Sequence, residues 1–269
     1  MRIVFIGGGN MASALIAGLL RESFGAEHIT VVEHNVDAQH HLRNEFRVAV
    51  SHELDAAVID AADVVVLAVK PQQLKALAEQ LQPLLDKQLL VSIAAGVRAA
   101  SLSVWLGGYT LVVRTMPNTP AMIGAGVTAL FALPAVSAMQ RKQAEVIMEA
   151  AGSVLWLEDE ALMDAVTAVS GSGPAYVFYF MEAMQEAGMA LGLSAAAARQ
   201  LTLETFLGAA KLAETSPEEV AQLRARVTSR GGTTEQAILS MQGAGVQAAI
   251  NQAVFAAAHR SKELGDALA

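Results

Sequence analysis

Uninterrupted apolar runs, rich in β-branched residues, alternate with stretches of helical period over residues 1–158. Such runs are typical of strands buried on both faces of a parallel sheet, because a strand with one solvated face alternates apolar with polar residues. Between most runs, as in Met11–Arg21 and Gln72–Leu85, apolar residues recur at helical spacing. The predicted strands are Arg2–Ile6, Ile29–Val32, Val48–Val50, Val64–Val69, Leu89–Ile93, Thr110–Arg114, Val127–Phe131 and Val154–Leu157. This order predicts an α/β domain over residues 1–158, with a doubly wound parallel sheet covered by helices.

The strand pattern ends at Glu158, and the remaining sequence predicts helices only. Ser172 followed by Pro174 is typical of an N-cap with proline in the first helical turn, and Gly192 is a typical helix stop. The predicted helices are Ala161–Val169, Gly173–Gly192, Ser194–Glu214, Pro217–Arg226, Thr233–Gln242 and Val246–Leu264. The pattern therefore predicts a second, all-α domain over residues 159–269.

The long predicted helix Gly173–Gly192 is apolar around almost its whole circumference. Its polar exceptions after Tyr176 are Glu182, Gln185 and Glu186, which fall on one narrow stripe. A helix of this kind is buried on several sides, and a helical domain of this size has few other elements to surround it. We therefore expect an obligate homodimer formed through the helical domain, with a central helix in a monomeric bundle as the alternative.

Composition and charge narrow the classes of function. Of the residues, 54% are hydrophobic and 16% charged, which excludes a disordered chain. The formal charge of −8 comes without a basic block, so we expect no nucleic-acid partner. No apolar run approaches the ~20 residues that a membrane span needs, so we expect no membrane partner. The lack of a secretory signal and of cysteine predicts a cytoplasmic protein without a thiolate nucleophile or Cys-ligated zinc.

A glycine-rich turn follows the first predicted strand and precedes a helix, in the pattern Gly7-x-Gly9-x-x-Ala12. The first glycine permits a tight turn, the second lets the backbone approach a pyrophosphate, and the alanine allows close packing of helix on strand. The N–H groups at the helix N-terminus then face the phosphates. The pattern predicts a dinucleotide site. Its expected contacts at this turn are Gly7, Gly9, Asn10 and Met11.

An acid, Glu33, ends the second predicted strand, about 20 residues beyond the turn. A carboxylate at this place accepts hydrogen bonds from an adenosine ribose and repels a 2′-phosphate. Glu33 therefore favours NADH over NADPH. The alternative is an exposed acid at the start of the next helix.

Other strands end in segments that suit the same ligand, because open α/β sheets bind ligands at the carboxyl ends of their strands. The expected cofactor contacts at the end of the fourth predicted strand are Ala68, Val69, Lys70 and Pro71. The small residues within Leu90–Val97 offer a flat surface for a nicotinamide ring, although ordinary packing explains them equally well. In the stiff loop Arg114–Ala121, Asn118 has an amide that could fix a ligand, and a merely rigid connection is the alternative.

Two loops of the second domain lead into helices and offer hydroxyl and backbone N–H groups. These loops are Ser170–Tyr176 and Val227–Glu235. Such a helix start holds a small carboxylate without a dedicated cation, and plain helix capping is the alternative. The second loop is the better candidate, because Gly231 and Gly232 expose the backbone there. The six histidines form no i, i+4 pair, so we predict no metal site.

Taken together, these segments resemble the pyrroline-5-carboxylate reductases over the whole chain. The glycine-rich turn is common to many dehydrogenases. The segments that begin at Arg114, Ser170 and Ser229, in this order and spacing, are specific to this family. The segments that carry the resemblance are Gly7-Gly8-Gly9-Asn10-Met11, Ala68-Val69-Lys70-Pro71, Ser92-Ile93-Ala94-Ala95-Gly96-Val97, Arg114-Thr115-Met116-Pro117-Asn118-Thr119-Pro120, Ser170-Gly171-Ser172-Gly173-Pro174-Ala175-Tyr176-Val177-Phe178 and Ser229-x-Gly231-Gly232-Thr233-Thr234.

The resemblance implies hydride transfer from NADPH or NADH to the C=N carbon of 1-pyrroline-5-carboxylate, which gives L-proline in the last step of proline biosynthesis. It also implies a Rossmann-like domain and a helical domain that interlocks with a second subunit, and it leaves open whether the homodimers assemble into larger rings. A protonated imine is already electrophilic, so catalysis can consist mainly of positioning.

The resemblance also assigns roles to residues. Ser229, Gly232 and Thr233 hold the substrate carboxylate, and Thr234 hydrogen-bonds the ring nitrogen as the catalytic residue. The residues that frame the nicotinamide are Ala94, Ala95, Gly96 and Asn118. Two departures matter: Arg230 stands where the family commonly has proline, and Glu33 replaces the small or hydroxyl residue of members that prefer NADP.

Two other functions are compatible with parts of this pattern. Another imine or 3-hydroxyacid reductase has a similar two-domain build, but hydroxyacid enzymes of that build usually place a catalytic lysine in the connecting helix. The segment Glu158–Tyr176 contains no lysine. A non-catalytic NAD-sensing dimer would not need the hydroxyl-rich loops of the second domain.

Overall fold

The computed structural model describes residues 1–268, which form two compact units. Unit 1 is Met1–Ser172 together with the chain from Ala257 on, and unit 2 is Gly173–Ala256. Unit 1 thus extends beyond the boundary expected at residue 158, because the segment after it packs on the sheet. Met163 in that segment is fully buried, and Glu160 pairs with Arg114 of the sheet.

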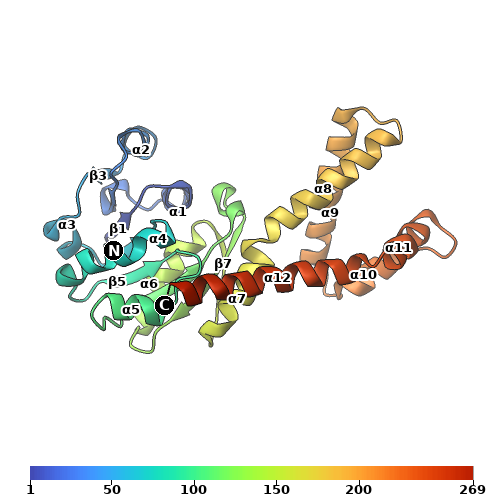
Figure 1. The fold of residues 1–269 in the computed structure, drawn as a ribbon. Helices are drawn as coiled ribbons and strands as arrows, with labels where there is room; N and C mark the ends of the chain where they lie inside the picture. Colours follow the sequence, from blue (N-terminus) through green and yellow to red (C-terminus); the bar gives the residue numbers. More distant parts are fainter. Residues whose placement is uncertain (269) are drawn as a thin grey trace. The chain divides into compact units, whose positions relative to one another are not determined.

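Unit 1 is built on an eight-stranded sheet in the order β3-β2-β1-β4-β5-β6-β7-β8 (Figure 1). The neighbours from β3 to β6 in this order run parallel. The strand order reverses direction between β1 and β4, which opens a crevice at the carboxyl ends of these strands. The strands are β1 (Ile3–Ile6), β2 (Ile29–Val32), β3 (Ala49–Ser51), β4 (Val64–Leu67), β5 (Leu89–Ser92), β6 (Val112–Met116), β7 (Gly126–Ala132) and β8 (Gly152–Trp156).

The predicted doubly wound α/β sheet is confirmed, with one difference at its edge. Strand β7 runs antiparallel to β6, and β8 runs parallel to β7. The connection from β6 to β7 holds only a short 3-10 turn, Thr119–Ile123, which is too short for the crossover that a parallel partner needs.

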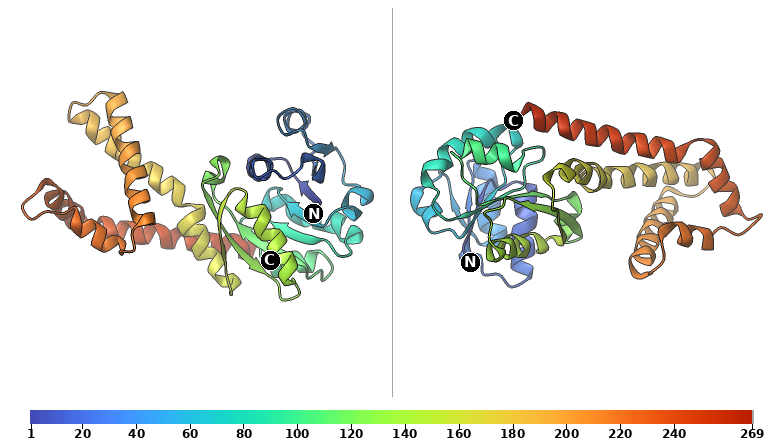
Figure 2. Two further views of the ribbon diagram at one scale, coloured as in Figure 1. Left: turned by 180° about the vertical axis from the view of Figure 1, so that it is seen from behind. Right: turned by 90° about the horizontal axis from the view of Figure 1, so that it is seen from below.

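Helices cover both faces of the sheet, as the views of Figure 2 show. Along β1, Ile3 and Phe5 enter one core cluster and Val4 and Ile6 enter the other. All four side chains are buried, so the uninterrupted apolar run reflects burial on two sides. The helices of unit 1 are α1 (Asn10–Arg21), α2 (Val36–His41), α3 (Ala56–Asp60), α4 (Pro71–Leu81), α5 (Ala99–Trp105), α6 (Ala138–Glu149) and α7 (Met163–Val166).

A π-helix, Thr167–Gly171, follows α7 and is capped by Ser172. Ser172 has helical dihedral angles, φ −86° and ψ −20°, so it is not the extended N-cap that the sequence suggests. The chain passes almost directly from the π-helix into α8.

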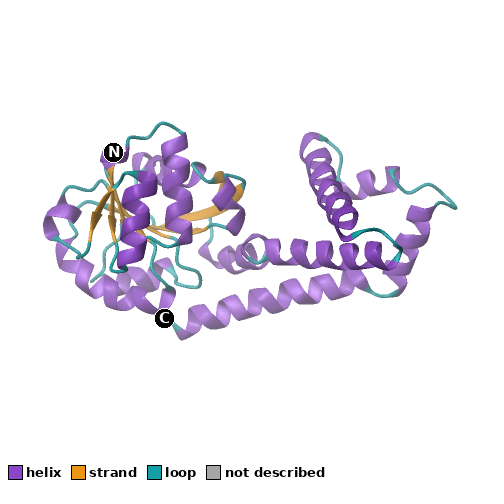
Figure 3. Cartoon of the chain, turned by 90° about the horizontal axis from the view of Figure 1, so that it is seen from above, coloured by secondary structure: helices purple, strands orange, loops and turns teal. Residues whose placement is uncertain are grey.

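Unit 2 consists of helices and their connections, and no strand occurs in its described residues (Figure 3). Its long helices α8 and α9 pack against each other. No residue of α8 is fully buried within the chain, and Phe178 and Tyr179 on it are 64% and 72% exposed. Among the described residues, no helix has the length and apolar character to cross a membrane. The helices are α8 (Gly173–Ala190), α9 (Ala195–Thr215), α10 (Val220–Arg226), α11 (Thr233–Gly243) and α12 (Val246–Ala267), whose last turns belong to unit 1.

Candidate functional site

The glycine-rich turn connects β1 to α1. Gly7 has a φ of +98°, and a Cβ at this position would lie 2.7 Å from the carbonyl oxygen of Ala68, so only glycine fits. A Cβ on Gly9 would meet no atom within 4 Å, which leaves open space above the turn. No side chain caps α1 at Gly9, so its first N–H groups can bind an anion such as a phosphate.

Glu33 directly follows β2 and points its carboxylate at this turn. Its Oε2 accepts a hydrogen bond from the backbone N–H of Gly8 at 2.8 Å, and its Oε1 accepts one from Asn35 N at 2.7 Å. These bonds orient the carboxylate at the edge of the turn. Its free lone pairs remain available to hydroxyl donors.

A hollow of about 690 Å³ lies at the carboxyl ends of β1, β2 and β4 and against α4. It brings together six of the predicted cofactor residues, namely Gly7, Gly9, Glu33, Ala68, Val69 and Lys70. This is the crevice that the strand order creates. Sequence reasoning missed the other side of the hollow, although the helical spacing after Pro71 could have found it. The missed lining residues on that side, all on α4, are Gln72, Gln73, Ala76, Leu77 and Gln80; His34 and Asn35, which follow Glu33, were missed as well.

The remaining predicted cofactor residues lie outside the lining of this hollow. Asn10 and Met11 begin α1, and Pro71 begins α4. The segment Ala94–Gly96 follows β5, beside the end of β4. Gly96 has a φ of +77°, which favours glycine.

Asn118 ties the loop after β6 to two neighbouring segments. Its Oδ1 accepts a hydrogen bond from Val127 N at 2.9 Å, and its Nδ2 donates one to the carbonyl of Ser170 at 3.3 Å. One amide N–H remains for a ligand. This arrangement suits both a side chain that frames the nicotinamide and a residue that only keeps the loop rigid.

A buried ion pair lies beneath these loops. Arg114 on β6 is 5% exposed, and its Nη1 lies 2.9 Å from Oε1 of Glu160. The same oxygen accepts a hydrogen bond from Ala99 N, in the first turn of α5, at 2.6 Å. Glu160 thus links β6 to the segment that follows Gly96. Sequence reasoning missed it, although a buried arginine on a strand requires an acid.

The second predicted loop lies in unit 2, between α10 and α11. Gly232 precedes α11 in an extended conformation, and its N–H donates to the carbonyl of Ser229 at 3.0 Å. Gly231 has a φ of +74°. No side chain caps α11, so the N–H groups of Thr233 and Thr234 can hold an anion.

The first predicted loop, Ser170–Tyr176, offers fewer free hydrogen-bond donors for a carboxylate. Ser170 and Gly171 lie within the π-helix, and the Ser170 hydroxyl donates to the carbonyl of Val166 at 3.2 Å. Of the two loops, Ser229–Thr234 is therefore the better candidate for the carboxylate site.

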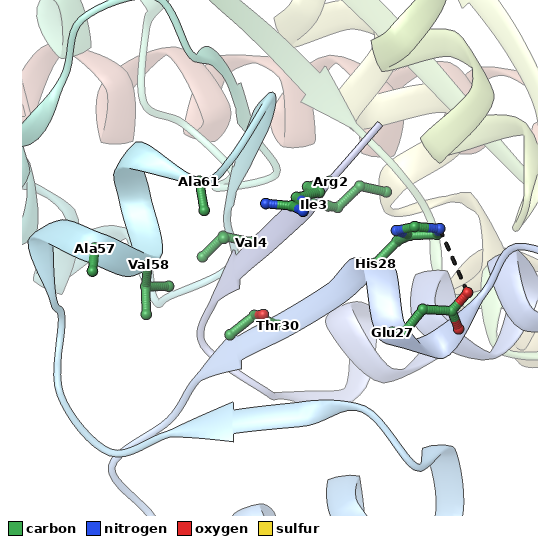
Figure 4. A pocket seen from close by; sticks show the side chains of 9 residues that line it. All are labelled: Arg2, Ile3, Val4, Glu27, His28, Thr30, Ala57, Val58 and Ala61. Carbon is green, nitrogen blue, oxygen red and sulfur yellow. Dashed lines mark ion pairs between the residues drawn. The ribbon is translucent and has the colours of Figure 1, made fainter.

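The chemistry of these residues is that of binding and orientation. The residues that the structure describes contain no cluster of three or more His, Cys, Asp or Glu side chains that could hold a metal ion. A second hollow, of about 270 Å³, lies at the amino ends of β1 and β2 (Figure 4). It is lined in part by Arg2, Glu27 and His28, and it contains none of the predicted site residues.

Two family models match the chain. The model described as pyrroline-5-carboxylate reductase dimerisation matches residues 160–264, and the model described as NADP oxidoreductase, coenzyme F420-dependent, matches residues 2–96. The second model covers the glycine-rich turn and the segment Ala94–Gly96.

Individual proteins match almost the full chain. The pyrroline-5-carboxylate reductase of Pseudomonas aeruginosa is 51% identical over 99% of this chain and 98% of its own length. The structure of a pyrroline-5-carboxylate reductase from Coxiella burnetii is 42% identical with a TM-score of 0.92, and 98% of each chain is covered. The Plasmodium falciparum pyrroline carboxylate reductase, solved with NADP bound, is 28% identical with a TM-score of 0.88 and the same coverage.

Proposed function

Because this chain belongs to the pyrroline-5-carboxylate reductase family, we propose that unit 1 holds the dinucleotide and the loop Ser229–Thr234 of unit 2 holds the substrate. The enzyme reduces 1-pyrroline-5-carboxylate to L-proline with NAD(P)H, in proline biosynthesis. The observation that carries the proposal is the hollow at the ends of β1, β2 and β4, which joins the uncapped start of α1 to Glu33.

The dinucleotide follows the strand order along the carboxyl edge of the sheet. Adenosine lies at the end of β2, where Glu33 accepts hydrogen bonds from the ribose. The pyrophosphate lies on the turn Gly7–Gly9 with Asn10 and Met11, and Ala68–Pro71 line the path onward. The nicotinamide lies over Ala94, Ala95 and Gly96, with Asn118 at its margin.

We propose a preference for NADH over NADPH. The Glu33 carboxylate is fixed beside Gly8 by two backbone N–H groups, so it meets a 2′-phosphate without room to turn away. Repulsion between the two anions costs more in a partly buried site than in water. The Plasmodium falciparum relative holds NADP, so this preference would be a property of the present chain.

The substrate carboxylate is held by the Ser229 hydroxyl and by the N–H group of Thr233 at the start of α11. Gly232, whose own N–H donates to the Ser229 carbonyl, shapes the turn that presents these groups. Thr234 hydrogen-bonds the ring nitrogen and is the catalytic residue. Arg230 adds a cation to this loop. Since the protonated imine already attracts hydride, these contacts act by holding the C=N carbon against the hydride donor.

We propose that the enzyme is a homodimer formed through the helical domain. The apolar side chains of α8 are largely exposed in the single chain, and an exposed apolar surface of this kind marks an interface. A cytoplasmic location completes the proposal, since it fits an enzyme that consumes reduced nicotinamide dinucleotide; the proposal for the assembly stops at the homodimer.

The experiment that tests the proposal follows absorbance as the enzyme oxidises NADH or NADPH with 1-pyrroline-5-carboxylate. We expect kcat/KM to be higher with NADH. Equal or higher kcat/KM with NADPH would overturn the preference, and the family assignment would stand.

A further inference from the structure

The end of α12 lies against the loop that we place under the nicotinamide. In Figure 1 this end of the helix lies beside α5, and both belong to unit 1. Gly265 is buried there, and a Cβ added to it would lie 3.0 Å from the carbonyl oxygen of Gly96. A Cβ on Gly96 would in turn lie 3.5 Å from the Leu264 Cβ. The two backbones therefore approach closely at a glycine on each side.

Side chains on the same helix end hold it in place. The Arg98 guanidinium pairs with the Asp266 carboxylate. One turn earlier, the buried Ser261 donates its hydroxyl to Asp164 Oδ1 at 2.6 Å. Leu268 packs against the core cluster on one face of the sheet. The helix end is thus fastened on both sides of Gly265.

The loop itself is held at its other end by a residue distant in sequence. Glu160 accepts the N–H of Ala99 and is fixed in turn by Arg114. The segment from Ala94 to Arg98 is therefore placed by contacts from α12 and from the chain after β8. Its own sequence contributes a flexible Gly96, which does not fix the position of the loop by itself.

We propose that Gly265 is a positioning residue for the nicotinamide half of the dinucleotide. This inference rests on the proposed function, which places the nicotinamide on Ala94–Gly96. A methyl group at position 265 pushes on the Gly96 carbonyl and shifts the loop by a few tenths of an ångström or more. Hydride transfer depends steeply on the distance between donor and acceptor, and a 1 Å error can cost about 100-fold in rate.

The test compares two ligands on Gly265→Ala. ADP-ribose binds through the adenosine and pyrophosphate sites alone, whereas NADH also reports the nicotinamide site. We expect the Kd of ADP-ribose to change less than twofold. The Kd of NADH should rise severalfold and kcat should fall about tenfold. Lys262→Ala is the matched control, because Lys262 is exposed on the same helix end and should leave all three values unchanged.

Equal changes in the Kd of ADP-ribose and NADH would overturn the inference, because general damage to unit 1 affects both ligands. Unchanged kcat and NADH affinity would overturn it as well. If Gly265→Ala does not fold, Asp266→Ala serves as the second variant, because it removes the ion pair with Arg98. It should raise the Kd of NADH more than the Kd of ADP-ribose, by a smaller factor than Gly265→Ala would. An Asp266→Ala enzyme without this difference would overturn the inference. Failure of the wild-type enzyme to bind NADH more tightly than ADP-ribose would instead count against the proposed nicotinamide site.

Discussion

The Oε2 atom of Glu33 accepts a hydrogen bond from the backbone N–H of Gly8 at 2.8 Å. This bond joins the end of β2 to the turn after β1, so the acid that we propose for the ribose and the glycines that we propose for the pyrophosphate form one surface. A second bond, from Asn35 N to Oε1 at 2.7 Å, keeps the carboxylate from rotating. The negative charge therefore stays where we propose that the ribose binds, and a 2′-phosphate on that ribose would meet it.

Replacing Glu33 with serine should reverse or weaken the preference for NADH. The substitution removes the repulsive charge and leaves a hydroxyl that can bond to a phosphate. We expect the ratio of kcat/KM for NADPH to that for NADH to rise at least about tenfold, which corresponds to ~1.4 kcal/mol. Steady-state kinetics with both dinucleotides measures the ratio.

Glu27→Ser is the control for this change, since Glu27 is an exposed acid at the amino end of β2, away from the hollow. The Glu27→Ser enzyme should have the same ratio of kcat/KM for NADPH to kcat/KM for NADH as the wild type. A Glu33→Ser enzyme with an unchanged ratio would show that the carboxylate does not select the dinucleotide.

The glycine-rich turn, the acid and the parallel strands could be predicted because each depends on residues close together in sequence. Gly7 has a positive φ, which leaves a glycine at this place in the sequence. The four residues of β1 are buried on both faces of the sheet, which leaves an uninterrupted apolar run. The prediction of a parallel sheet was wrong for β7, which runs antiparallel to β6, because its direction depends on the length of the preceding connection. The contact of Gly265 with Gly96 leaves no local pattern, because it joins segments at opposite ends of the chain.

In the candidate site, too, features that depend on neighbouring residues could be predicted, and features that depend on distant residues could not. The segment Ser229–Thr234 was identified from its motif, and its uncapped helix start agrees with an anion site. The side chains of α4 that line the hollow were missed, since the helix was interpreted only as cover for the sheet. Glu160 was missed because its partners, Arg114 and Ala99, come from other parts of the fold.

Removing the carboxylate of Glu160 should destabilise the protein strongly. Glu160→Ala leaves the Arg114 guanidinium buried without its partner and frees the N–H of Ala99. We expect the free energy of unfolding to fall by about 3 kcal/mol, the cost typical of a broken buried pair. Chemical denaturation measures it. Glu149→Ala breaks an exposed pair with Lys142 and should change the stability little; equal losses in both variants would contradict a special role for Glu160.

Tyr109 should make the stability fall at high pH. Burial, and secondarily the charge of Asp86, raises the pKa of Tyr109 to about 12, and its hydroxyl donates to the carbonyl of Gln88 at 2.6 Å. The protonated form is thus favoured in the folded state. Its contribution is complete below pH ~10, the usual pKa of tyrosine, and is lost between pH ~10 and the folded value.

The pH dependence is measured as the denaturation midpoint from pH 9 to pH 12, for the wild type and for Tyr109→Phe. The phenylalanine variant retains every other titrating group, so the difference between the two curves isolates Tyr109. We expect the wild-type curve to fall more steeply. Parallel curves would show that Tyr109 titrates alike in the folded and unfolded chains.

A charge on the exposed face of α8 should separate the subunits. Tyr179→Glu places an acid where we propose the partner to lie, and burying an unpaired charge there costs several kcal/mol. We expect light scattering to give the mass of a monomer and activity to fall. Met139→Glu is the matched control, because Met139 on α6 is also 72% exposed; a dimeric Tyr179→Glu enzyme would contradict the proposed interface.

The proposed division of the reaction between two units is tested most directly by NADH binding to Thr234→Ala. Thr234 lies on α11 in unit 2, whereas the proposed dinucleotide contacts lie in unit 1. The account predicts that turnover falls at least about tenfold, as expected when a hydrogen bond to the reacting group is lost, while the Kd of NADH in a fluorescence titration stays within twofold of the wild type. Thr234→Ser, which retains the hydroxyl, should keep most of the turnover. A Thr234→Ala enzyme that loses NADH affinity in parallel with turnover, or that loses neither, would contradict the account.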